Sequence, residues 1–453
     1  MENQVIFASE KSVRFGRVLW FILPTYLTSL FNTLYTIVDG IFVSQYVGTN
    51  ALAAINIVYP IVNILTGIAL VFAAGGSAMA AISIGANNEE RAGQEFTLCM
   101  VLSIGVGTAV SFLMFLFLPQ LLTFLGATKP TLSDCKVYAV IWLAGIPAVI
   151  GKELFTYFIR ADGSPGYSFF LAVAGGVTNI VLDYVFIARM GMGVLGAGLA
   201  TILGLMLSFS LGLLYFLRCK KYLRPVWKNL QLKIGLKCAV NGSSEFIDQL
   251  AIAITTVVFN RTALALVGEN GIAAVSIIMY LQFLFIGVYF GYSIGIVPLL
   301  SYAYGNSDGA ICKKLERYSY RFFAFAPVFM YALSYISAPL AVSFFASPKT
   351  GVYFLALSGM RLYGIGYLFS GLNIFTATRL TAYGKGHLSS VITFLRSFSL
   401  LLLFLFLFPI IWGMKGLWLA MPASELLTLF VSLRINCSVS KRLSFPKIQR
   451  KLG

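Results

Sequence analysis

The chain has 453 residues, of which 59% are hydrophobic and 11% are charged, and its mean hydropathy is +0.87. A soluble protein of this length needs far more charge to cover its surface, so the composition excludes an ordinary globular protein and indicates a membrane protein. The net charge of +17 falls in short clusters between apolar stretches. These clusters lack the aromatic and basic interleaving of a nucleic-acid surface, so we expect no nucleic-acid partner.

Twelve apolar stretches are long enough to cross a bilayer, because a helical span needs about 20 residues. They lie near residues 18–43, 51–84, 96–119, 136–158, 167–188, 195–217, 239–262, 271–302, 320–342, 353–376, 389–410 and 417–436. The second and the eighth are the longest, and Pro60 and Pro298 predict a kink in each of them. The sequence therefore predicts an all-α polytopic membrane protein with twelve transmembrane helices.

The distribution of Lys and Arg predicts the orientation of these spans. Twelve spans place both termini on one side, and most Lys and Arg residues fall in segments on that side. The strongest cluster is "RCKKYLRPVWKNLQLKIGLK" at 218–237, which has seven basic residues and no acidic one. We expect a multi-pass protein of the cell (cytoplasmic) membrane with both termini in the cytoplasm. The cluster is expected to act as a topology signal and linker, with an anionic-lipid or regulatory site as the alternative.

An internal repeat divides the chain into two halves. "VGTNALAAINI" at 47–57 matches "VGENGIAAVSI" at 267–277, and the same shift of 220 residues pairs Gly75 with Gly295 and Gly85 with Gly305. Six spans in each half make the halves parallel copies, related by an axis along the membrane normal. We expect an N-terminal six-helix lobe at 1–220, a basic cytoplasmic linker at 221–234 and a C-terminal six-helix lobe at 235–453.

Two carboxylates lie inside apolar spans of the first half. Helix rise places Asp39 and Asp183 roughly 7 Å below the outer face and Thr201 about 9 Å below it, with Tyr138 a little shallower. Asn179 lies one helical turn from Asp183. Two neighbouring carboxylates in lipid cannot both be bare and ionised, so we expect them to share a proton or a cation. The alternative is that hydrogen bonds to neighbouring groups make them structural.

Polar stripes on the first two spans predict a wet cavity, since an intramembrane polar face avoids lipid. Thr28, Asn32, Tyr35 and Asp39 form one stripe, and Asn56, Tyr59, Asn63 and Thr66 form the other. Acidic groups mixed with aromatic rings suit amphipathic cations. The candidate substrate-cavity residues are Asn32, Tyr35, Asn56, Tyr59, Asn63, Tyr138, Glu245, Asp248, Tyr289 and Tyr292.

The second half lacks the acidic pair, because the repeat places Phe259 where the first half has Asp39. It has Glu245 and Asp248 instead, on one face near the start of span seven. These two acids either line the cavity or form a polar helix end in cytoplasmic water. For Lys152 we expect a side chain that snorkels toward the membrane surface, and the partners of Arg361, Arg396 and Glu425 stay open.

No pattern of catalytic or metal-binding residues is present in the sequence. "GMGVLGAGLATILG" lacks the Lys and Ser/Thr of a phosphate loop, the six cysteines are scattered singly, and His387 is the one histidine. We therefore expect no enzyme, no metal site and no cofactor apart from a coupling ion.

Several segments resemble the multidrug and toxic compound extrusion (MATE) family. They are "LPTYLTSLFNTLYTIVDGIFVSQYVGTNALAAINI" (23–57), "FIRADGSPGYS" (158–168), "GGVTNIVLDYVFI" (175–187) and "GAGLATILG" (196–204). The resemblance implies a secondary antiporter that exports organic cations and amphipathic drugs in exchange for H⁺ or Na⁺. It also implies that Asp39, Asn179, Asp183 and Thr201 form the cation/proton site, and that the first helix bends at Pro24.

Two other functions stay open beside the antiporter. One is a flippase for lipid-linked oligosaccharides or peptidoglycan precursors of the same superfamily, and the other is a membrane enzyme or structural membrane protein. The expected partners are small amphipathic cations and membrane lipid, and the expected state is a monomer.

Overall fold

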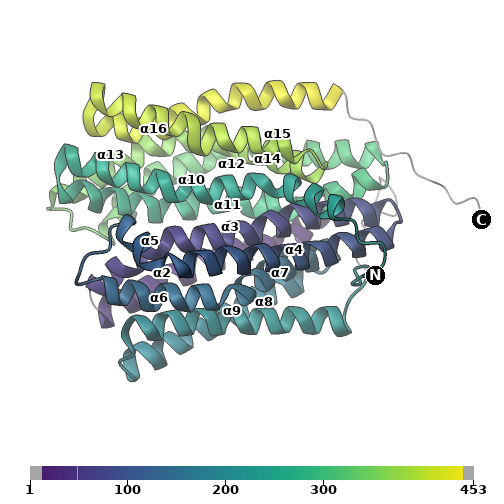
Figure 1. Ribbon diagram of the computed structural model, residues 1–453. Helices are drawn as coiled ribbons and strands as arrows, with labels where there is room; N and C mark the ends of the chain where they lie inside the picture. The colour runs from purple at the N-terminus through teal and green to yellow at the C-terminus, as the bar shows by residue number, and fades with distance from the viewer. Residues whose placement is uncertain (1–12, 48, 442–453) are drawn as a thin grey trace, which may run out of the picture.

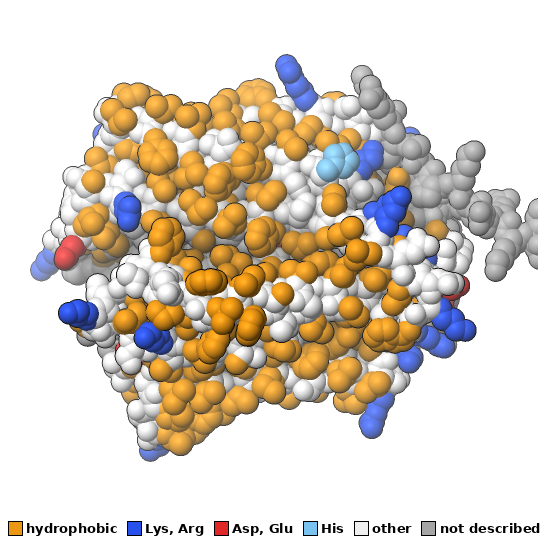
Figure 2. Space-filling model, in the orientation of Figure 1, with side chains coloured by type: hydrophobic (Ala, Val, Ile, Leu, Met, Phe, Trp, Pro, Cys, Tyr) orange, Lys and Arg blue, Asp and Glu red, His pale blue; other side chains and the backbone are white. Residues whose placement is uncertain are grey.

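The helices of this protein run side by side along a common direction (Figure 1). The computed structural model describes residues 13–47 and 49–441, and this part of the chain is almost wholly helical, with no β-strand. Apolar side chains cover the middle of the visible surface, whereas Lys and Arg gather toward its two ends (Figure 2). Large apolar side chains such as Phe112, Phe325 and Ile410 are exposed on the protein surface. An apolar belt with charged ends is the surface of a multi-pass membrane protein.

The two halves are built from helices in the same order. The first half has α2 (Phe15–Tyr46), α3 (Thr49–Gly85), α4 (Glu89–Leu116), α5 (Leu118–Phe124), α6 (Leu132–Ala144), α7 (Ile146–Ala161), α8 (Pro165–Asp183), a π-helical turn (Tyr184–Arg189) and α9 (Gly193–Arg218). The second half has α10 (Leu232–Val267), α11 (Glu269–Gly305), α12 (Gly309–Ser343), α13 (Gly351–Tyr363), a 3₁₀ turn (Gly364–Gly366), α14 (Tyr367–Ala382), α15 (Gly386–Thr393), a π-helical turn (Phe394–Ser399) and α16 (Leu400–Lys441).

The described helices account for the twelve predicted spans. Ten of them are long and apolar enough to cross a bilayer, and α6 with α7 makes an eleventh span that bends by 53°. The last of the ten covers Gly386–Ser440, which has 55 residues and would be roughly 80 Å long if it were straight, against a hydrocarbon core of about 30 Å. Gly413 has non-helical backbone angles and divides this segment into two spans. The predicted all-α membrane architecture is confirmed.

The break in the fourth span recurs at matching positions of the two halves. α3 and α11 run without interruption through Pro60 and Pro298, where the sequence predicted kinks. The fourth span of each half breaks at glycine instead, at Gly145 in the first half and at Gly364–Gly366 in the second. Glycine favours these positions because it adds no side chain to a tightly packed bend.

The turns between helices also repeat at the same spacing. Asn87 and Ser307 both have positive φ, at 56° and 55°. In each half the next residue caps the following helix: Asn88 Oδ1 accepts from the Arg91 N–H, and Asp308 Oδ1 accepts from the Ile311 N–H, both at 3.0 Å. The repeat predicted from the sequence is therefore present in the backbone.

The halves meet tightly at one end of the molecule, which we call the linker end because it carries residues 219–231 and the turns at 86–88 and 306–308. Here α3 crosses α10 at Gly75 and Gly242, where a Cβ on either glycine would overlap the backbone of the other helix. α3 also crosses α11 at Gly85 and Gly305, two positions that correspond in the repeat. Direct backbone contact of this kind needs residues without side chains.

Candidate functional site

An acidic cluster lies where α2, α8 and α9 of the first half meet. Gly176 of α8 faces the rings of Phe31 and Tyr35 on α2, and a Cβ at this glycine would overlap the Phe31 ring. Gly204 of α9 packs against the backbone of α8 in the same way. These close approaches bring the polar residues of the three helices within reach of one another.

The cluster contains the four residues that the family resemblance selected. Asp183 and Asn179 are buried on α8, and Asn179 Nδ2 donates to Thr201 Oγ1 of α9 over 3.4 Å. Asp39 of α2 is close enough to Asp183 for the two carboxyl groups to interact electrostatically. The structure thus brings together three helices whose residues lie up to 162 positions apart in the sequence.

Four acceptor oxygens of this cluster have no hydrogen-bond donor among the described residues. They are Asp39 Oδ1, Asn179 Oδ1, and Asp183 Oδ1 and Oδ2, all of them buried. Buried polar atoms of folded proteins are nearly always paired, because an unpaired one costs about 1–3 kcal/mol. A group of oxygens that only accept is satisfied by a proton or by a metal cation, so the donor set fits either kind of ion.

Two tyrosines complete the surroundings of Asp39. Tyr138 of α6 is buried and its ring contacts that of Trp142 at a tilt, and its hydroxyl interacts electrostatically with both aspartates. Tyr59 of α3 is also within range of Asp39 and is 44% exposed. Tyr138, which the sequence placed at a similar depth, therefore lies near the aspartates.

The predicted helix-bend residue lies in an unbroken helix. Pro24 is inside α2, and Thr28 Oγ1 donates to its carbonyl over 2.8 Å. Proline removes one helical hydrogen bond, so this turn is a weak point in α2. Asn32 and Tyr35 are half-buried on the same helix, between Pro24 and the acidic cluster.

The second predicted stripe, on α3, divides between exposed and buried positions. Asn56 and Tyr59 are exposed, whereas Asn63 is buried and no described residue pairs with its Nδ2 atom. Only the buried part of this stripe faces the interior of the protein. None of its residues lines the two cavities described next.

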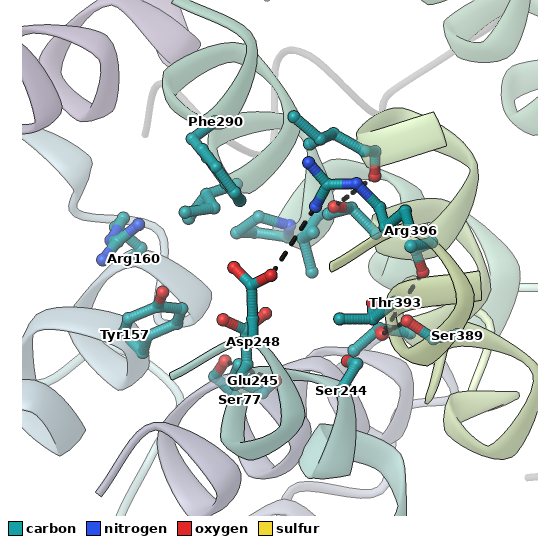
Figure 3. A pocket seen from close by; sticks show the side chains of 18 residues that line it. Ser77, Tyr157, Arg160, Ser244, Glu245, Asp248, Phe290, Ser389, Thr393 and Arg396 are labelled. Carbon is teal, nitrogen blue, oxygen red and sulfur yellow. Dashed lines mark hydrogen bonds and ion pairs between the residues drawn. The ribbon is translucent and has the colours of Figure 1, made fainter. Parts of the chain in front are cut away.

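Glu245 and Asp248 lie in a pocket between the two halves. Both acids line a pocket of about 40 Å³ together with Tyr157 and Arg160 from α7 and Phe290 from α11 (Figure 3). α10 begins at Leu232, so Glu245 lies roughly 20 Å inside the helix and not at its end. Both acids therefore line a pocket and do not form a helix end.

Arg396 is the centre of an ion-pair network in the second half. Its guanidinium lies 3.0 Å from Glu425 Oε1 and 3.7 Å from Asp248 Oδ1. Asn373 Nδ2 donates to Glu425 Oε2 over 2.7 Å, and Ser397 Oγ donates to Asp248 Oδ1 over 2.6 Å. Each charge in this network has a counter-charge or a hydrogen-bond donor. These contacts supply the partners of Arg396 and Glu425, which the sequence leaves open.

Lys152 and Arg361 also have partners within the protein. Lys152 Nζ donates to Glu153 Oε1 over 2.7 Å, and both side chains are mostly buried. The predicted snorkelling of Lys152 is therefore wrong, because its charge is neutralised by its neighbour. Arg361 lies over the ring of Tyr335, with 4.9 Å between the guanidinium carbon and the ring centre.

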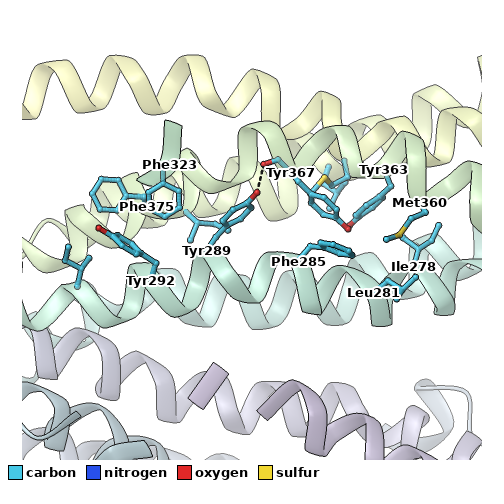
Figure 4. Close-up of a cluster of buried hydrophobic side chains, with 14 of the residues drawn as sticks. Ile278, Leu281, Phe285, Tyr289, Tyr292, Phe323, Met360, Tyr363, Tyr367 and Phe375 are labelled. Carbon is cyan, nitrogen blue, oxygen red and sulfur yellow. Dashed lines mark hydrogen bonds between the residues drawn. The ribbon is translucent and has the colours of Figure 1, made fainter. Parts of the chain in front are cut away.

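Tyr289 and Tyr292 belong to the hydrophobic core of the second half, not to a cavity. Both are buried (Figure 4), and their hydroxyls donate to the Tyr367 carbonyl over 3.1 Å and to Ser319 Oγ over 3.2 Å. The prediction that they line the substrate cavity is wrong for this conformation. They lie on the face of α11 that packs against α12 and α14. Sequence alone does not separate this face from the opposite one, since α11 is apolar all round.

A larger cavity of about 270 Å³ adjoins this core, and Asp248 is the one predicted cavity residue in its lining. Phe259, Gln282, Phe290, Tyr363 and Met421 line it, with Ser29 and Thr33 of α2 on the side of the first half. Phe259 stands where the repeat places Asp39. Since Asp39 lies inside the first half and not at this cavity, the repeat gave no signal for a cavity wall at Phe259.

Comparison with known proteins identifies the family. The MatE family model matches the chain twice, over residues 24–185 and 246–407. Two relatives named multidrug export protein MepA match almost the whole chain: that of Staphylococcus haemolyticus (strain JCSC1435) is 23% identical and covers 99% of this chain and 98% of its own length, and that of Staphylococcus aureus (strain N315) is 24% identical and covers 95% of each.

Solved structures agree on the fold. A MATE protein in complex with MaL6 superposes with a TM-score of 0.90 at 21% identity and covers 97% of this chain and 98% of its own. An outward-facing multidrug resistance MATE family transporter gives a TM-score of 0.87 at 22% identity and covers 94% and 96%. The family model matches more than half of the chain, and the chain therefore belongs to the multidrug and toxic compound extrusion (MATE) family.

Proposed function

We propose that this protein is a secondary active antiporter that exports amphipathic organic cations in exchange for protons or sodium ions. Relatives named for multidrug export match it end to end, which supports export as the direction and drugs as the cargo. The proposal includes an orientation with both termini in the cytoplasm, so that the linker end faces the cytoplasm.

One observation carries the proposal. Asp39, Asn179 and Asp183 present four buried acceptor oxygens that no donor of the described residues satisfies. An intramembrane carboxylate without a partner is costly, and residues of this kind mark ion or proton pathways. A proton shared by the two aspartates, or a sodium ion bound between them, removes the cost.

Ion binding drives export only when the two conformations bind the ion with different affinities. The acidic cluster lies toward the end opposite the linker end, whereas the glycine crossings of α3 with α10 and α11 close the linker end. In the proposed cycle an ion from outside binds to the cluster while the cytoplasmic side is shut. Separation of the crossings then opens the space between the halves to the cytoplasm.

The space between the halves suits an amphipathic cation. The pocket of about 40 Å³ presents the carboxylate of Glu245 beside the rings of Tyr157 and Phe290. Ligand sites for drug-sized molecules measure about 300–1,000 Å³, so this pocket admits such a substrate only after the halves move apart. Rings and apolar walls tolerate many shapes, which suits a transporter of several drugs.

The direct test is transport by the purified protein in liposomes, with a proton gradient and a sodium gradient imposed separately. A fluorescent cationic dye should move against its gradient with at least one of the two ions. An Asp183→Asn variant at equal protein density is the control for leakage. The flippase would be favoured over the antiporter if neither gradient drove dye transport and if the protein bound lipid-linked sugars but not dyes.

A further inference from the structure

A buried aspartate outside the membrane-spanning part of the fold holds the connection between the two halves. Asp162 directly follows α7 in the segment "FIRADGSPGYS" and is fully buried. Its Oδ1 accepts from the backbone N–H groups of Tyr222 (2.7 Å) and Leu223 (2.8 Å), and its Oδ2 accepts from the Lys221 N–H (2.8 Å) and the Tyr215 hydroxyl (2.7 Å). Four donors on one carboxylate form a strong anchor, because hydrogen bonds to a charged acceptor exceed neutral ones.

Helix α4 holds the segment that connects the two halves at a second place, through Val226 and Lys228. Thr97 Oγ1 accepts from the Val226 N–H over 2.9 Å, and Gln94 Nε2 donates to the Lys228 carbonyl over 3.2 Å. These contacts join residues 129 and 134 positions apart in the sequence. We call residues 220–228 the linker strap, since hydrogen bonds tie them to the first half near both ends.

Side-chain packing follows the same course. Leu223 of the linker strap is fully buried in the hydrophobic core of the first half. Gly93 of α4 lies directly under the carbonyl of Arg224, so that a Cβ at this position would overlap the strap. The surface of the first half is therefore shaped to receive the strap.

The hydrogen bonds between the linker strap and the first half end at Lys228. Within the described residues, positions 229–231 make no hydrogen bond to the first half, and the Gln231 carbonyl accepts from the Ile234 N–H as α10 begins. Asn229 has a φ of 53°, in the left-handed region that few residues other than glycine and asparagine adopt readily. Three residues between a fixed strap and a rigid helix are the place where backbone angles change when two bodies move.

We propose that Asp162 clamps the linker strap to the first half, so that the two halves move relative to each other about residues 229–231. The inference rests on the proposed function, since it assigns the pivot of the transport movement. Without the hydrogen bonds of Asp162, the linker strap is no longer held against the first half. The second half then has no fixed point of attachment from which its helices pack against α3. Asp162 touches neither ion nor substrate and is a positioning residue.

Two variants weaken the clamp to different degrees. Asp162→Ala removes all four acceptor contacts, and Asp162→Asn keeps one acceptor oxygen for Tyr222 and Leu223 but turns an N–H₂ group toward the Lys221 N–H. Thr97→Val removes a single contact of the strap far from Asp162 and tests the inference if Asp162→Ala does not fold. The matched control is Asp308→Asn, because Asn88 makes the same helix cap at the corresponding position of the first half.

Three readouts follow the variants in the purified full-length protein. Trypsin measures strap docking by cleavage after Lys220, Lys221 and Lys228. Spin labels on the exposed Cys219 and Cys437 measure the distance between the halves, since the other four cysteines are buried. Liposome transport gives the maximal rate and the ion concentration for half-maximal rate.

We expect strap cleavage to be about tenfold faster in Asp162→Ala, and faster by a smaller factor in Asp162→Asn and Thr97→Val, because local opening exposes the strap. The distribution of distances between the labels should broaden, and the maximal rate should fall while the half-maximal ion concentration stays the same. Asp308→Asn should match the wild type in all three.

Equal cleavage rates in all variants would overturn the clamp, and faster cleavage with an unchanged distance distribution would overturn the pivot. Trypsin cleavage and label distances do not depend on transport, so they test the clamp by themselves. A wild-type protein that transports nothing under either gradient would contradict the proposed function and not the clamp.

Discussion

The acidic cluster of the first half and the ion-pair network of the second half differ in how their charges are satisfied. Within the described part of the chain, Asp39 and Asp183 have unpartnered oxygens and form no ion pair with a cationic side chain. In the second half Arg396 neutralises Glu425 and faces Asp248, and Asn373 and Ser397 supply further donors. A site that already contains its counter-charge has little need of an ion from outside.

A buried carboxylate indicates ion binding only when its oxygens lack partners within the protein. Glu425 and Asp183 are both buried, yet the carboxylate of Glu425 is held by Arg396 and Asn373, whereas no described donor satisfies either oxygen of Asp183. We therefore propose that the first half binds the ion and that the Arg396 network positions helices.

The largest effect is expected from Asp183→Asn. The substitution keeps the size of the side chain and removes the group that takes up a proton or cation, so gradient-driven transport should fall by about 100-fold or more, the full coupling expected of an allosteric ion site. The amount of folded protein in the membrane should not fall, because the carboxylate has no partner to lose. Dye transport normalised to folded protein measures the effect, and transport above half of the wild-type rate would contradict the assignment.

Arg396→Met should act on folding and not on coupling. Removing the cation leaves Glu425 buried without its counter-charge, which is expected to lower stability by about 3–5 kcal/mol. The double variant Arg396→Met/Glu425→Gln should recover most of this loss, since Glu425 no longer carries an unpaired charge. Thermal unfolding in detergent measures both variants, and an Arg396→Met protein as stable as the wild type would show that the network is not structural.

Gly242→Ala should bias the two halves apart at the linker end. Its Cβ would overlap the carbonyl of Val71, so α3 and α10 cannot keep their present contact. Cys238 is buried at this crossing and should react with a maleimide about tenfold faster once the crossing opens. Gly105→Ala is the control, because nothing lies within 4 Å of a Cβ there. Equal labelling of Cys238 in both variants would argue against a gate at this crossing.

The smallest effect is expected from Tyr289→Phe. It removes one hydrogen bond, to the Tyr367 carbonyl, and should cost about 1 kcal/mol of stability with no change in the substrate profile. Dye competition assays measure the substrate profile of this variant and of Phe290→Ala. Phe290 lines both cavities, so Phe290→Ala should change the substrate profile whereas Tyr289→Phe should not. A changed substrate profile in Tyr289→Phe would show that Tyr289 lines the substrate cavity.

The fold follows from the sequence because lipid permits few solutions. Apolar stretches of span length and a repeat with a constant shift are enough to predict twelve helices in two parallel halves. The acidic cluster follows from depth along the helices and from the family resemblance, since Asp39, Asp183 and Thr201 are each a few residues from a helix end at the same side.

Which face of a helix points inward could not be derived for α11. Tyr289 and Tyr292 are as polar as cavity residues and lie on a helix that is apolar all round, so only packing against Phe323 and Tyr367 decides their place. Charge pairing is equally hidden, because Arg396, Asp248 and Glu425 come from three different helical segments. The start of α10 at Leu232, several residues ahead of the apolar stretch, is what places Glu245 in the interior and not at a helix end.

Infrared difference spectroscopy of carboxyl protonation tests the division between the two halves most directly. The purified protein is titrated with protons, and separately with sodium ions at fixed pH, while the C=O stretch of protonated carboxyl groups is followed. We predict that the ion-dependent carboxyl signal of the wild type is lost in both Asp39→Asn and Asp183→Asn and is retained in Glu425→Gln. A signal that persists in both aspartate variants and disappears in Glu425→Gln would contradict the account, because it would place the coupling ion in the second half.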